Sequence, residues 1–319
     1  MKVAVCGVWH VHAGGYAKTA KENAEVVGVW DQNPDRKAKF AEKHEIPAFD
    51  SFEDLLASDA EGVIVCSSTD THADLMVRIA DAGKHIFTEK VLALSDEDCL
   101  RIEEAVKRNN VKFVISLVWK YGPGPITLKR IVDAGEIGTI NYMRFRNCHS
   151  GSSNNWLPKH FYDAKECGGG AMIDLGAHGM YLIDWFCGQP TGYKSCFTNA
   201  CINPDALALN TDRVEDNAVT VMSYDNGCIA VNETGFVSYG FPSILEIGGE
   251  KGTLLWDGGD TITKKTNTPD KDTVVVELSR EDSKPSPLKQ FLSGNILPGC
   301  GIEEAKRLTH MMVEAYKNQ

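Results

Sequence analysis

Residues 2–12 read Lys-Val-Ala-Val-Cys-Gly-Val-Trp-His-Val-His. The apolar run that ends at Cys6 is typical of a buried β-strand, and it leads directly into a glycine turn. In a dinucleotide-binding fold this turn reads G-x-G-x-x-G. The first glycine permits the tight turn, the second lets the backbone approach the pyrophosphate, and the third lets the next helix pack on the strand. Because Trp9 and His12 replace the second and third glycines, the turn fits a dinucleotide site but also an ordinary strand–loop–helix.

The next predicted strand favours the dinucleotide interpretation. It covers residues 25–30 and is followed by Asp31 and Gln32. An acidic side chain at this position accepts hydrogen bonds from the adenosine ribose and repels a 2′-phosphate. We therefore expect NAD as the cofactor rather than NADP. The alternative is that Asp31 caps the helix that begins near Pro34.

The pattern of predicted elements divides the chain into two parts. Over residues 1–120, short β-branched runs alternate with helical stretches, which is typical of a parallel sheet covered by helices. Over residues 121–319, longer alternating runs joined by Asn-Gly or Gly-Gly turns indicate a largely antiparallel sheet. We predict an α/β Rossmann domain for dinucleotide binding, followed by an α+β domain with a large, mainly antiparallel open sheet, to which the resemblance described below assigns substrate binding and oligomerisation. The expected strands are 2–6, 25–30, 62–66, 85–88 and 111–117, then 139–147, 218–223, 229–235, 243–248 and 273–278; the expected helices are 13–22, 34–44, 71–82, 95–109, 126–134 and 303–317.

Composition narrows the class of protein. The net charge of −11 argues against nucleic acid as a partner, because nucleic acid requires a basic surface. No apolar run approaches the ~18–20 residues that span a bilayer, and the N-terminus lacks the features of a signal peptide. The ten cysteines form no C-x-x-C pair, and we interpret most of them as small, buried, reduced side chains. We therefore expect a cytoplasmic protein with no membrane partner.

Two blocks of sequence carry a more specific resemblance. The first is Ser67-Ser68-Thr69-Asp70-Thr71-His72 together with Ala82-Gly83-Lys84-His85-Ile86-Phe87-Thr88-Glu89-Lys90, and the second is Gly168-Gly169-Gly170-Ala171-Met172-Ile173-Asp174-Leu175-Gly176-Ala177-His178. In this order they resemble the glucose–fructose oxidoreductase and inositol dehydrogenase family (Gfo/Idh/MocA). Two positions differ from the family pattern. Val91 replaces a proline, which leaves open whether the preceding peptide bond is cis or trans, and Lys120 stands where many members have arginine.

The resemblance implies the roles of the candidate site residues. Lys90, Asp174 and His178 are implied as the catalytic set and also as substrate contacts. The implied cofactor contacts are Gly7, Val8, Trp9, His10, His12, Asp31, Gln32, Ser67, Ser68, Thr69, His72, Glu89 and Lys90. Lys120 is implied as a further substrate contact.

The expected chemistry requires such residues. Oxidation of a secondary alcohol removes a hydride from carbon and a proton from oxygen, so a base has to hold the hydroxyl group. An imidazole such as His178 exchanges a proton near neutrality. Asp174 precedes it by four residues, so on an α-helix the two share one face. Taken singly, each residue also fits a structural role: Lys90 on the surface, Asp174 at a helix start and His178 in the core.

Residue type alone suggests two further groups, one as substrate contacts and one as a candidate metal site. His149, Trp156 and His160 lie in a stretch rich in amides and hydroxyls, which suits a sugar substrate but also a polar surface loop. His10 and His12 form an H-x-H pair, but no third ligand lies nearby in sequence, and zinc requires three or four. We therefore expect no metal.

We predict an NAD-dependent oxidoreductase acting on a secondary alcohol or ketone of a sugar, a polyol or a sugar derivative. One alternative is a glycosidase or epimerase that retains NAD and oxidises its substrate transiently. Another is a ligand sensor without turnover. The resemblance further suggests a homodimer or homotetramer, whereas the substrate and the direction of the reaction stay open.

Overall fold

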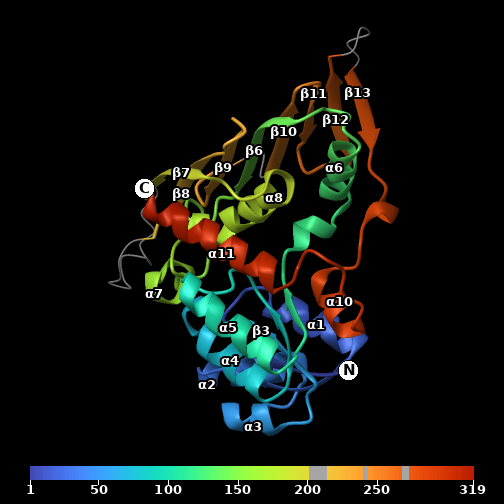
Figure 1. Ribbon diagram of the computed structural model, residues 1–319. Helices are drawn as coiled ribbons and strands as arrows, with labels where there is room; N and C mark the ends of the chain where they lie inside the picture. Colours follow the sequence, from blue (N-terminus) through green and yellow to red (C-terminus); the bar gives the residue numbers. More distant parts are fainter. Residues whose placement is uncertain (201–213, 240–242, 268–272) are drawn as a thin grey trace. The chain divides into compact units, whose positions relative to one another are not determined.

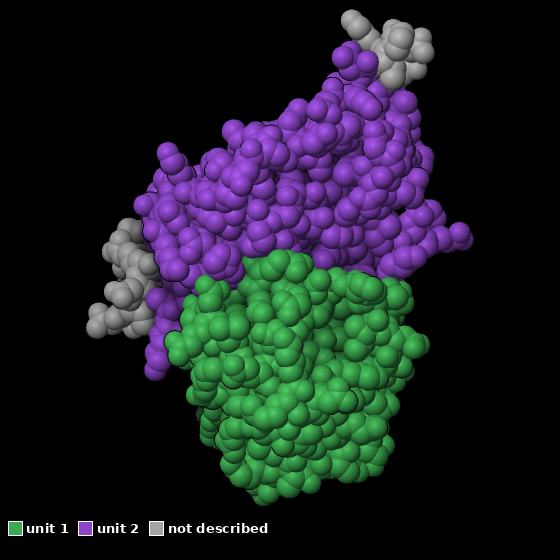
Figure 2. Space-filling view, viewed as in Figure 1, with its two compact units in different colours: residues 1–117, 285–309 green, residues 118–284, 310–319 purple. Residues whose placement is uncertain are grey.

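The structure is a computed structural model that describes residues 1–200, 214–239, 243–267 and 273–319 (Figure 1). The chain divides into two compact units (Figure 2). Unit 1 comprises residues 1–117 and 285–309, and unit 2 comprises residues 118–284 and 310–319. The assignment of residues 1–120 to the cofactor and 121–319 to the substrate stays a prediction, and we describe each unit by itself.

Unit 1 contains a five-stranded parallel sheet with the strand order β2-β1-β3-β4-β5. The strands are short and apolar, as expected for a sheet buried on both faces. Every residue of β3 is buried, as are Val3, Ala4, Val5 and Cys6 of β1. The strands are β1 (Lys2–Cys6), β2 (Glu25–Trp30), β3 (Gly62–Val65), β4 (His85–Thr88) and β5 (Phe113–Ile115).

The helices of unit 1 begin at recognisable caps. Ser95 accepts the Asp98 N–H at the start of α5, and Asn33 accepts the Arg36 N–H at the start of α2. Near the C-terminus, α10 returns to unit 1, where its Phe291 ring lies 6.0 Å from Phe87 of β4. The helices are α1 (Ala13–Asn23), α2 (Pro34–His44), α3 (Phe52–Ala57), η1 (Thr69–Thr71), α4 (His72–Asp81), α5 (Asp96–Arg108) and α10 (Pro287–Ser293); α11 (Ile302–Lys317) begins in unit 1 and ends in unit 2.

Unit 2 is built on an eight-stranded sheet with the order β13-β12-β11-β10-β6-β9-β8-β7. All neighbouring strands are antiparallel except β6 and β9, which run parallel. The turn at Asp225-Asn226-Gly227 joins β8 to β9 as the predicted hairpin. The strands are β6 (Ile140–Cys148), β7 (Gly192–Thr198), β8 (Asn217–Ser223), β9 (Ile229–Gly235), β10 (Ser243–Gly249), β11 (Gly252–Trp256), β12 (Thr261–Thr266) and β13 (Thr273–Glu277).

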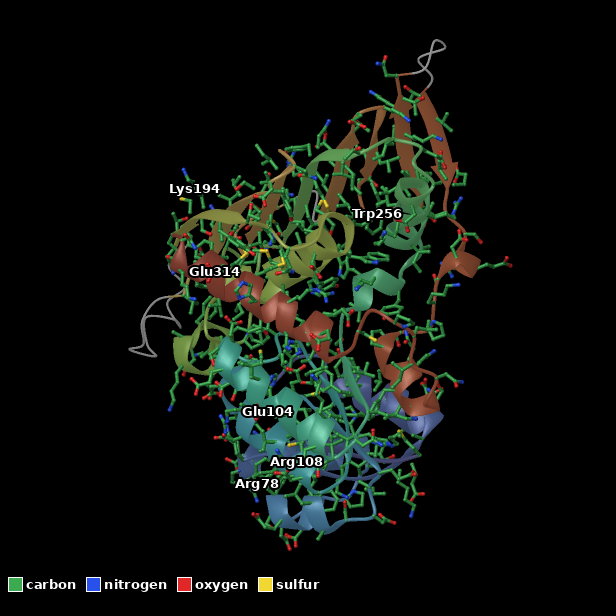
Figure 3. The ribbon with its side chains drawn as sticks, viewed as in Figure 1. Arg78, Glu104, Arg108, Lys194, Trp256 and Glu314 are labelled. Atoms are coloured by element: carbon green, nitrogen blue, oxygen red, sulfur yellow. The ribbon has the colours of Figure 1, made fainter. Side chains whose placement is uncertain are left out.

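Helices α6 and α8 pack against this sheet (Figure 1). Burial alternates along β8, β9 and β10, so these strands have one covered face and one more exposed face. Trp256, labelled in Figure 3, fills the space beside α6 where Gly124 has no side chain. The helical segments of unit 2 are η2 (Val118–Tyr121), α6 (Pro123–Asp133), η3 (Lys159–Tyr162), α7 (Ala164–Cys167), the π-helical turn η4 (Met172–Gly176), α8 (Ala177–Cys187) and η5 (Arg280–Asp282).

The predicted fold class is confirmed, with a parallel sheet in unit 1 and a large, mainly antiparallel sheet in unit 2. The sequence analysis missed α3, α7, α10, β7, β11 and β12, and it gave no bounds for the helix α8 that carries His178. Of the nine cysteines in the described residues, seven are buried, in line with their expected packing role, and Cys201 lies outside the described residues. Among the helices of the described residues, none combines the length and the apolar character that crossing a membrane requires.

Candidate active site

The turn after β1 depends on Gly7. Its φ is +82°, and a Cβ there would lie 2.5 Å from the backbone of Ser67, so only glycine fits. The Gly7 N–H donates to the Trp30 carbonyl at 2.7 Å. The N–H groups of Trp9 and His10 both donate to the Cys66 carbonyl at 3.1 Å. These hydrogen bonds hold the turn against the end of β2 and the loop that follows β3.

Asp31 lies at the end of β2 with its carboxylate buried. One oxygen accepts the N–H of Val8 at 2.7 Å, and the other accepts the N–H of Asn33 at 2.7 Å and contacts Arg36 Nε at 3.3 Å. The residue that caps α2 is Asn33, so the capping alternative for Asp31 is wrong. The carboxylate instead joins the glycine turn to the end of β2, beside the exposed Gln32.

Glu89, directly after β4, is the centre of a buried polar network. Its Oε1 lies 2.7 Å from His12 Nδ1 and accepts a short hydrogen bond from the Tyr16 hydroxyl. Tyr16 also contacts Ser116 Oγ at 2.7 Å, and Glu89 Oε2 accepts the N–H of Lys90 at 3.1 Å. The histidine in the place of the third glycine is therefore tied to a carboxylate 77 residues away.

The charge of Glu89 is stabilised by its neighbours. Burial alone raises the pKa of this carboxyl. The neighbouring His10, His12 and Lys90 lower it by more than burial raises it, so the net pKa is well below the ordinary value. His10, His12 and Glu89 offer ligand atoms that all lie within 4.8 Å of one another. No third ligand lies near the H-x-H pair in sequence, but the tertiary structure brings Glu89 beside it. The expected absence of a metal stays a prediction, which elemental analysis of purified protein tests.

Lys90 is buried and lies directly after Glu89 in the loop that follows β4. Its peptide bond to Val91 is cis. His72 holds this loop from the other side. Its Nδ1 lies 3.1 Å from the Val91 carbonyl and its Nε2 lies 3.2 Å from the Ser67 carbonyl. His72 thus connects two loops that both carry predicted cofactor contacts.

The remaining predicted cofactor residues lie in the first of these loops. Ser68 Oγ donates to Asp70 at 2.6 Å, whereas Ser67 Oγ is buried and has no hydrogen-bond partner among the described residues. Thr69 begins the short helix η1. A buried hydroxyl without such a partner is a group that a bound ligand can satisfy.

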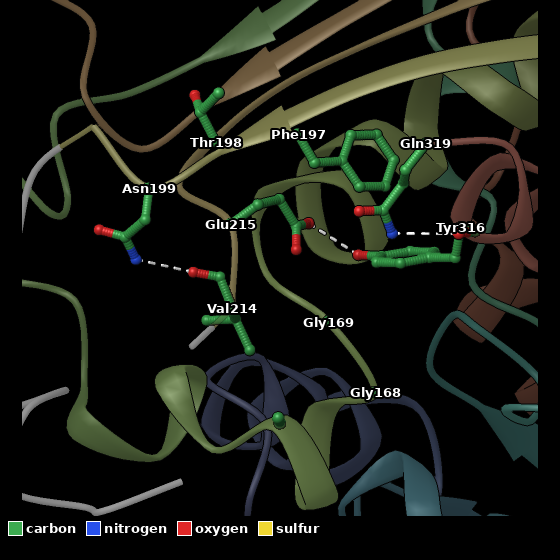
Figure 4. A pocket seen from close by; sticks show the side chains of 10 residues that line it. Gly168, Gly169, Phe197, Thr198, Asn199, Val214, Glu215, Tyr316 and Gln319 are labelled. Atoms are coloured by element: carbon green, nitrogen blue, oxygen red, sulfur yellow. Dashed lines mark hydrogen bonds between the residues drawn. The ribbon is translucent and has the colours of Figure 1, made fainter. Parts of the chain in front are cut away.

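In unit 2, the glycines before the candidate catalytic residues lie close to Glu215: Gly168, Gly169 and Glu215 line one pocket (Figure 4), and Gly170 packs directly against Glu215. The Glu215 carboxylate accepts the N–H groups of Gly170 at 3.0 Å and Met172 at 2.8 Å, and also the Tyr316 hydroxyl at 2.7 Å. A Cβ on Gly170 would lie 1.9 Å from the Glu215 carbonyl oxygen, and one on Gly169 would lie 2.0 Å from Tyr316 Oη. These contacts within unit 2 require glycine at Gly169 and Gly170.

Asp174 lies in the π-helical turn Met172–Gly176, and His178 lies in the first turn of α8. The segment that contains Asp174 is therefore π-helical rather than regular α-helix, and a shared face for the two side chains stays a prediction. The carbonyls of the turn are held by strand side chains: Asn232 donates to Gly176 at 2.8 Å and Thr234 donates to Ala171 at 3.1 Å. A π-turn is uncommon and frequent at functional sites.

The imidazole of His178 is buried beside aromatic side chains. Its Nδ1 is 2.9 Å from the Tyr181 hydroxyl, and its ring centroid is 5.9 Å from that of Trp119. Lys120, also buried, places its ammonium group 5.4 Å from the centre of the Trp185 ring on α8. Unit 2 thus brings His178 and Lys120 to the same helix, whereas Lys90 belongs to unit 1.

His149 follows β6 and is held in one tautomer. Its Nδ1 accepts the N–H of Gly151 at 3.0 Å, so its proton in the neutral form is on Nε2. Its ring stacks on Phe236 at 4.9 Å and lies 4.6 Å from the ring of Trp156. Burial lowers the pKa of His149, while nearby Asp174 opposes that shift. Neutral His149 therefore offers an N–H donor near Asp174.

Trp156 and His160 differ in their surroundings. Trp156 is exposed. The His160 ring lies 5.1 Å from that of Phe161, and its carbonyl accepts the Cys167 thiol at 3.2 Å.

The sequence analysis missed three contact residues. Tyr16 follows His12 by four residues and Tyr181 follows His178 by three, which are spacings that place side chains on one helix face. These spacings were signals that could have found both tyrosines. Glu215 is 45 residues from Gly170, and nothing in its local sequence indicates the contact.

Two family profiles match the chain. Residues 1–117 match the oxidoreductase family with an NAD-binding Rossmann fold, and residues 126–255 match the GFO/IDH/MocA C-terminal domain. The chain belongs to the Gfo/Idh/MocA oxidoreductase family. It is an oxidoreductase of the dehydrogenase class, and its cofactor is NAD. The Gly7 turn, which has no room for a Cβ, and the buried Asp31 carboxylate after β2 both fit this cofactor.

Several members of the Gfo/Idh/MocA family are similar to this chain. An uncharacterised oxidoreductase of Bacillus subtilis, YrbE, is 26% identical over 77% of this chain and 70% of its own length. The inositol 2-dehydrogenase of Salmonella typhimurium is 28% identical over 79% of this chain and 72% of its own length. A solved structure of levoglucosan dehydrogenase in complex with NADH has a TM-score of 0.82 at 19% identity, covering 100% of this chain and 98% of that one.

Proposed function

We propose that the protein is an NAD-dependent dehydrogenase that acts on a secondary alcohol, or in reverse on a ketone, of a sugar, a polyol or a sugar derivative. The observation that carries this proposal is the buried Lys90 beside the Glu89 network in an NAD-binding Rossmann domain. Open α/β sheets bind their ligands at the carboxyl ends of the strands, which is where Lys90 lies. Relatives named inositol 2-dehydrogenase and a similar structure named levoglucosan dehydrogenase support the substrate class.

The proposed roles follow from the side chains. Bound NAD supplies the hydride acceptor. The Lys90 ammonium donates a hydrogen bond to the reacting oxygen and stabilises negative charge on it. His178 takes the hydroxyl proton, and Asp174 orients the substrate or the imidazole. Asp31 and Gln32 contact the ribose of the cofactor, and the loops at Gly7–His12 and Ser67–His72 contact the remainder.

The substrate is proposed to lie against unit 2. The neutral His149 provides an N–H donor and Trp156 an aromatic surface, and both suit a polyhydroxylated ring. Lys120 and His160 are proposed as further contacts. The domain assignment, residues 1–120 for the cofactor and 121–319 for the substrate and for a homodimer or homotetramer, belongs to the same proposal.

A substrate screen tests the function. Inositols, aldoses, anhydrosugars and glycosides are incubated with the protein and NAD, and NADH formation is followed by its absorbance. Turnover-dependent NADH release with at least one polyol or sugar is expected, and its loss in Lys90→Met ties the signal to the proposed site. Product formation without net NADH would favour the transient-oxidation class, and binding without any product would favour a sensor.

A further inference from the structure

The His178 imidazole is held on one side by the hydroxyl of Tyr181. His178 Nδ1 lies 2.9 Å from Tyr181 Oη, and the two side chains are 8% and 2% exposed. The backbone N–H of Trp119 donates to the same hydroxyl oxygen at 3.1 Å. An amide N–H can only donate, so the phenol oxygen serves as an acceptor there. The hydroxyl is thus anchored by the main chain rather than by a flexible side chain.

The ring of His178 is also fixed in orientation. The Tyr181 ring lies edge-on to it, with centroids 5.6 Å apart and planes at 82°. The Trp119 ring lies on a tilted plane at 37°, with centroids 5.9 Å apart. Rotation of the imidazole would break the Nδ1 contact, and these two rings restrict it because buried side chains are closely packed.

We propose that Tyr181 is a positioning residue for His178: its hydroxyl oxygen accepts the Nδ1–H and keeps the proton-accepting lone pair on Nε2. This inference rests on the proposed function, in which His178 exchanges a proton with the reacting oxygen. The partner of one ring nitrogen decides which nitrogen carries the proton in neutral histidine. In this arrangement the phenol oxygen accepts from Trp119 and from His178, and its own O–H points away from both.

A neutral partner suits a group that has to gain and lose a proton. When Nε2 takes the substrate proton, Nδ1–H keeps donating to Tyr181, so the contact persists through the whole cycle. A phenol stays protonated at neutral pH, so this partner adds no negative charge beside the imidazole. Tyr181 therefore orients His178 and selects its tautomer through a neutral hydroxyl group.

Tyr181→Phe tests the proposal, since it keeps the ring packing and removes only the hydroxyl. We expect kcat to fall about 3- to 10-fold, the effect of losing one hydrogen bond, while KM and the Kd for NAD stay within about twofold. Tyr193→Phe is the matched control. Tyr193 Oη is also buried in unit 2 but has no hydrogen-bond partner among the described residues, so this variant keeps its kcat.

A second measurement reads the tautomer directly. The chain has nine histidines, so ¹⁵N-histidine labelling gives a small set of imidazole signals, and His178→Gln identifies the pair that belongs to His178. In the wild type, above the pH at which this ring titrates, we expect a protonated Nδ1 and an unprotonated Nε2. In Tyr181→Phe, we expect a smaller fraction of His178 to carry its proton on Nδ1. A wild-type proton on Nε2, or an unchanged tautomer in the variant, would overturn the proposal.

The two measurements separate this inference from the proposed function. The nitrogen shifts are recorded on the protein without substrate, so they judge the Tyr181 contact even if no sugar or polyol is oxidised. A chain with the expected tautomer but no turnover would retain the contact and refute the dehydrogenase assignment. An active enzyme whose tautomer and kcat are unaffected by Tyr181→Phe would refute the positioning role alone.

Discussion

The glycine turn of unit 1 (residues 7–12) and the glycine block of unit 2 (Gly168–Gly170) differ in how many of their positions have to be glycine. In the turn, only Gly7 is required by close backbone approach, and the place of the third glycine holds His12, which is tied to Glu89. In the block, Gly169 and Gly170 contact Tyr316 and Glu215 so closely that neither position has room for a Cβ. The difference teaches that a glycine in such a block has to be judged by what its missing side chain would touch.

The largest expected effect separates chemistry from packing in unit 1. Lys90 and Lys84 are both buried, at 5% and 6% exposure, but Lys84 donates to the carbonyls of Ser58 and Ala60. We expect Lys90→Met to lower kcat about 10²–10⁴-fold because it removes a group from the proton transfer, with NAD binding nearly unchanged. Lys84→Met should lower the free energy of unfolding and leave kcat close to that of the wild type. Steady-state kinetics and calorimetry measure both; a Lys90→Met variant with more than about a third of wild-type kcat would remove Lys90 from catalysis.

In unit 2, the loss of the proposed proton acceptor His178 is expected to have an equally large effect on kcat. His178→Ala should also cost about 10²–10⁴-fold in kcat. Because Lys90 and His178 would serve one proton transfer, the double variant should lose less than the product of the two single effects. Strictly multiplicative losses would indicate that the two residues act independently.

The next largest effect concerns the glycine block. Gly170→Ala should lower the free energy of unfolding by about 1–3 kcal/mol, because its Cβ would overlap the Glu215 backbone. Gly15→Ala is the matched control: this exposed position in α1 has nothing within 4 Å of the added Cβ. There we expect a gain of roughly 0.5–1 kcal/mol from helix propensity. Urea unfolding of both variants measures the contrast, and equal stabilities would contradict the close packing around Glu215.

A smaller effect is expected at the end of β2. Asp31→Ala should weaken NAD binding and narrow the preference for NAD over NADP by about tenfold, since the carboxylate no longer repels a 2′-phosphate. Calorimetric titration of the wild type and the variant with both cofactors measures the change. A wild type that binds both cofactors equally would remove Asp31 from its assigned role.

The smallest effect tests the Glu89 network through pH. The pKa of Glu89 is lower in the folded protein than its ordinary value of 4.5, so as the pH falls through that value the unfolded chain takes up a proton that the folded chain does not. The stability from this carboxylate is therefore present above about pH 5 and is lost at lower pH. Between about pH 5.5 and about pH 3.5, the wild type should lose roughly 1 kcal/mol more stability than Glu89→Gln. Parallel pH dependences in urea unfolding would show that the carboxylate is not stabilised by folding.

The sequence by itself determined the fold class and most of the longer elements. Apolar strands such as Lys2–Cys6 and capped helices such as Asp96–Arg108 are specified by neighbouring residues, so their patterns predict them. The Asn-Gly turn likewise determined the hairpin between β8 and β9. The elements that were missed carry weaker local signals: α3 has six residues, and β12 reads Thr-Ile-Thr-Lys-Lys-Thr, with a polar side chain at five of its six positions.

Only the tertiary structure decided which polar groups meet. His12 and Glu89 are 77 residues apart, and Gly170 and Glu215 are 45 apart, so no local pattern links them. The contact of His12 with Glu89 joins the turn after β1 to the end of β4 across the intervening strand β3, and contacts with Tyr316 and Glu215 require glycine at Gly169 and Gly170. The physical reason is that periodicity reports which face of an element is buried, whereas hydrogen bonds between distant elements depend on register and on distances of a few tenths of an ångström.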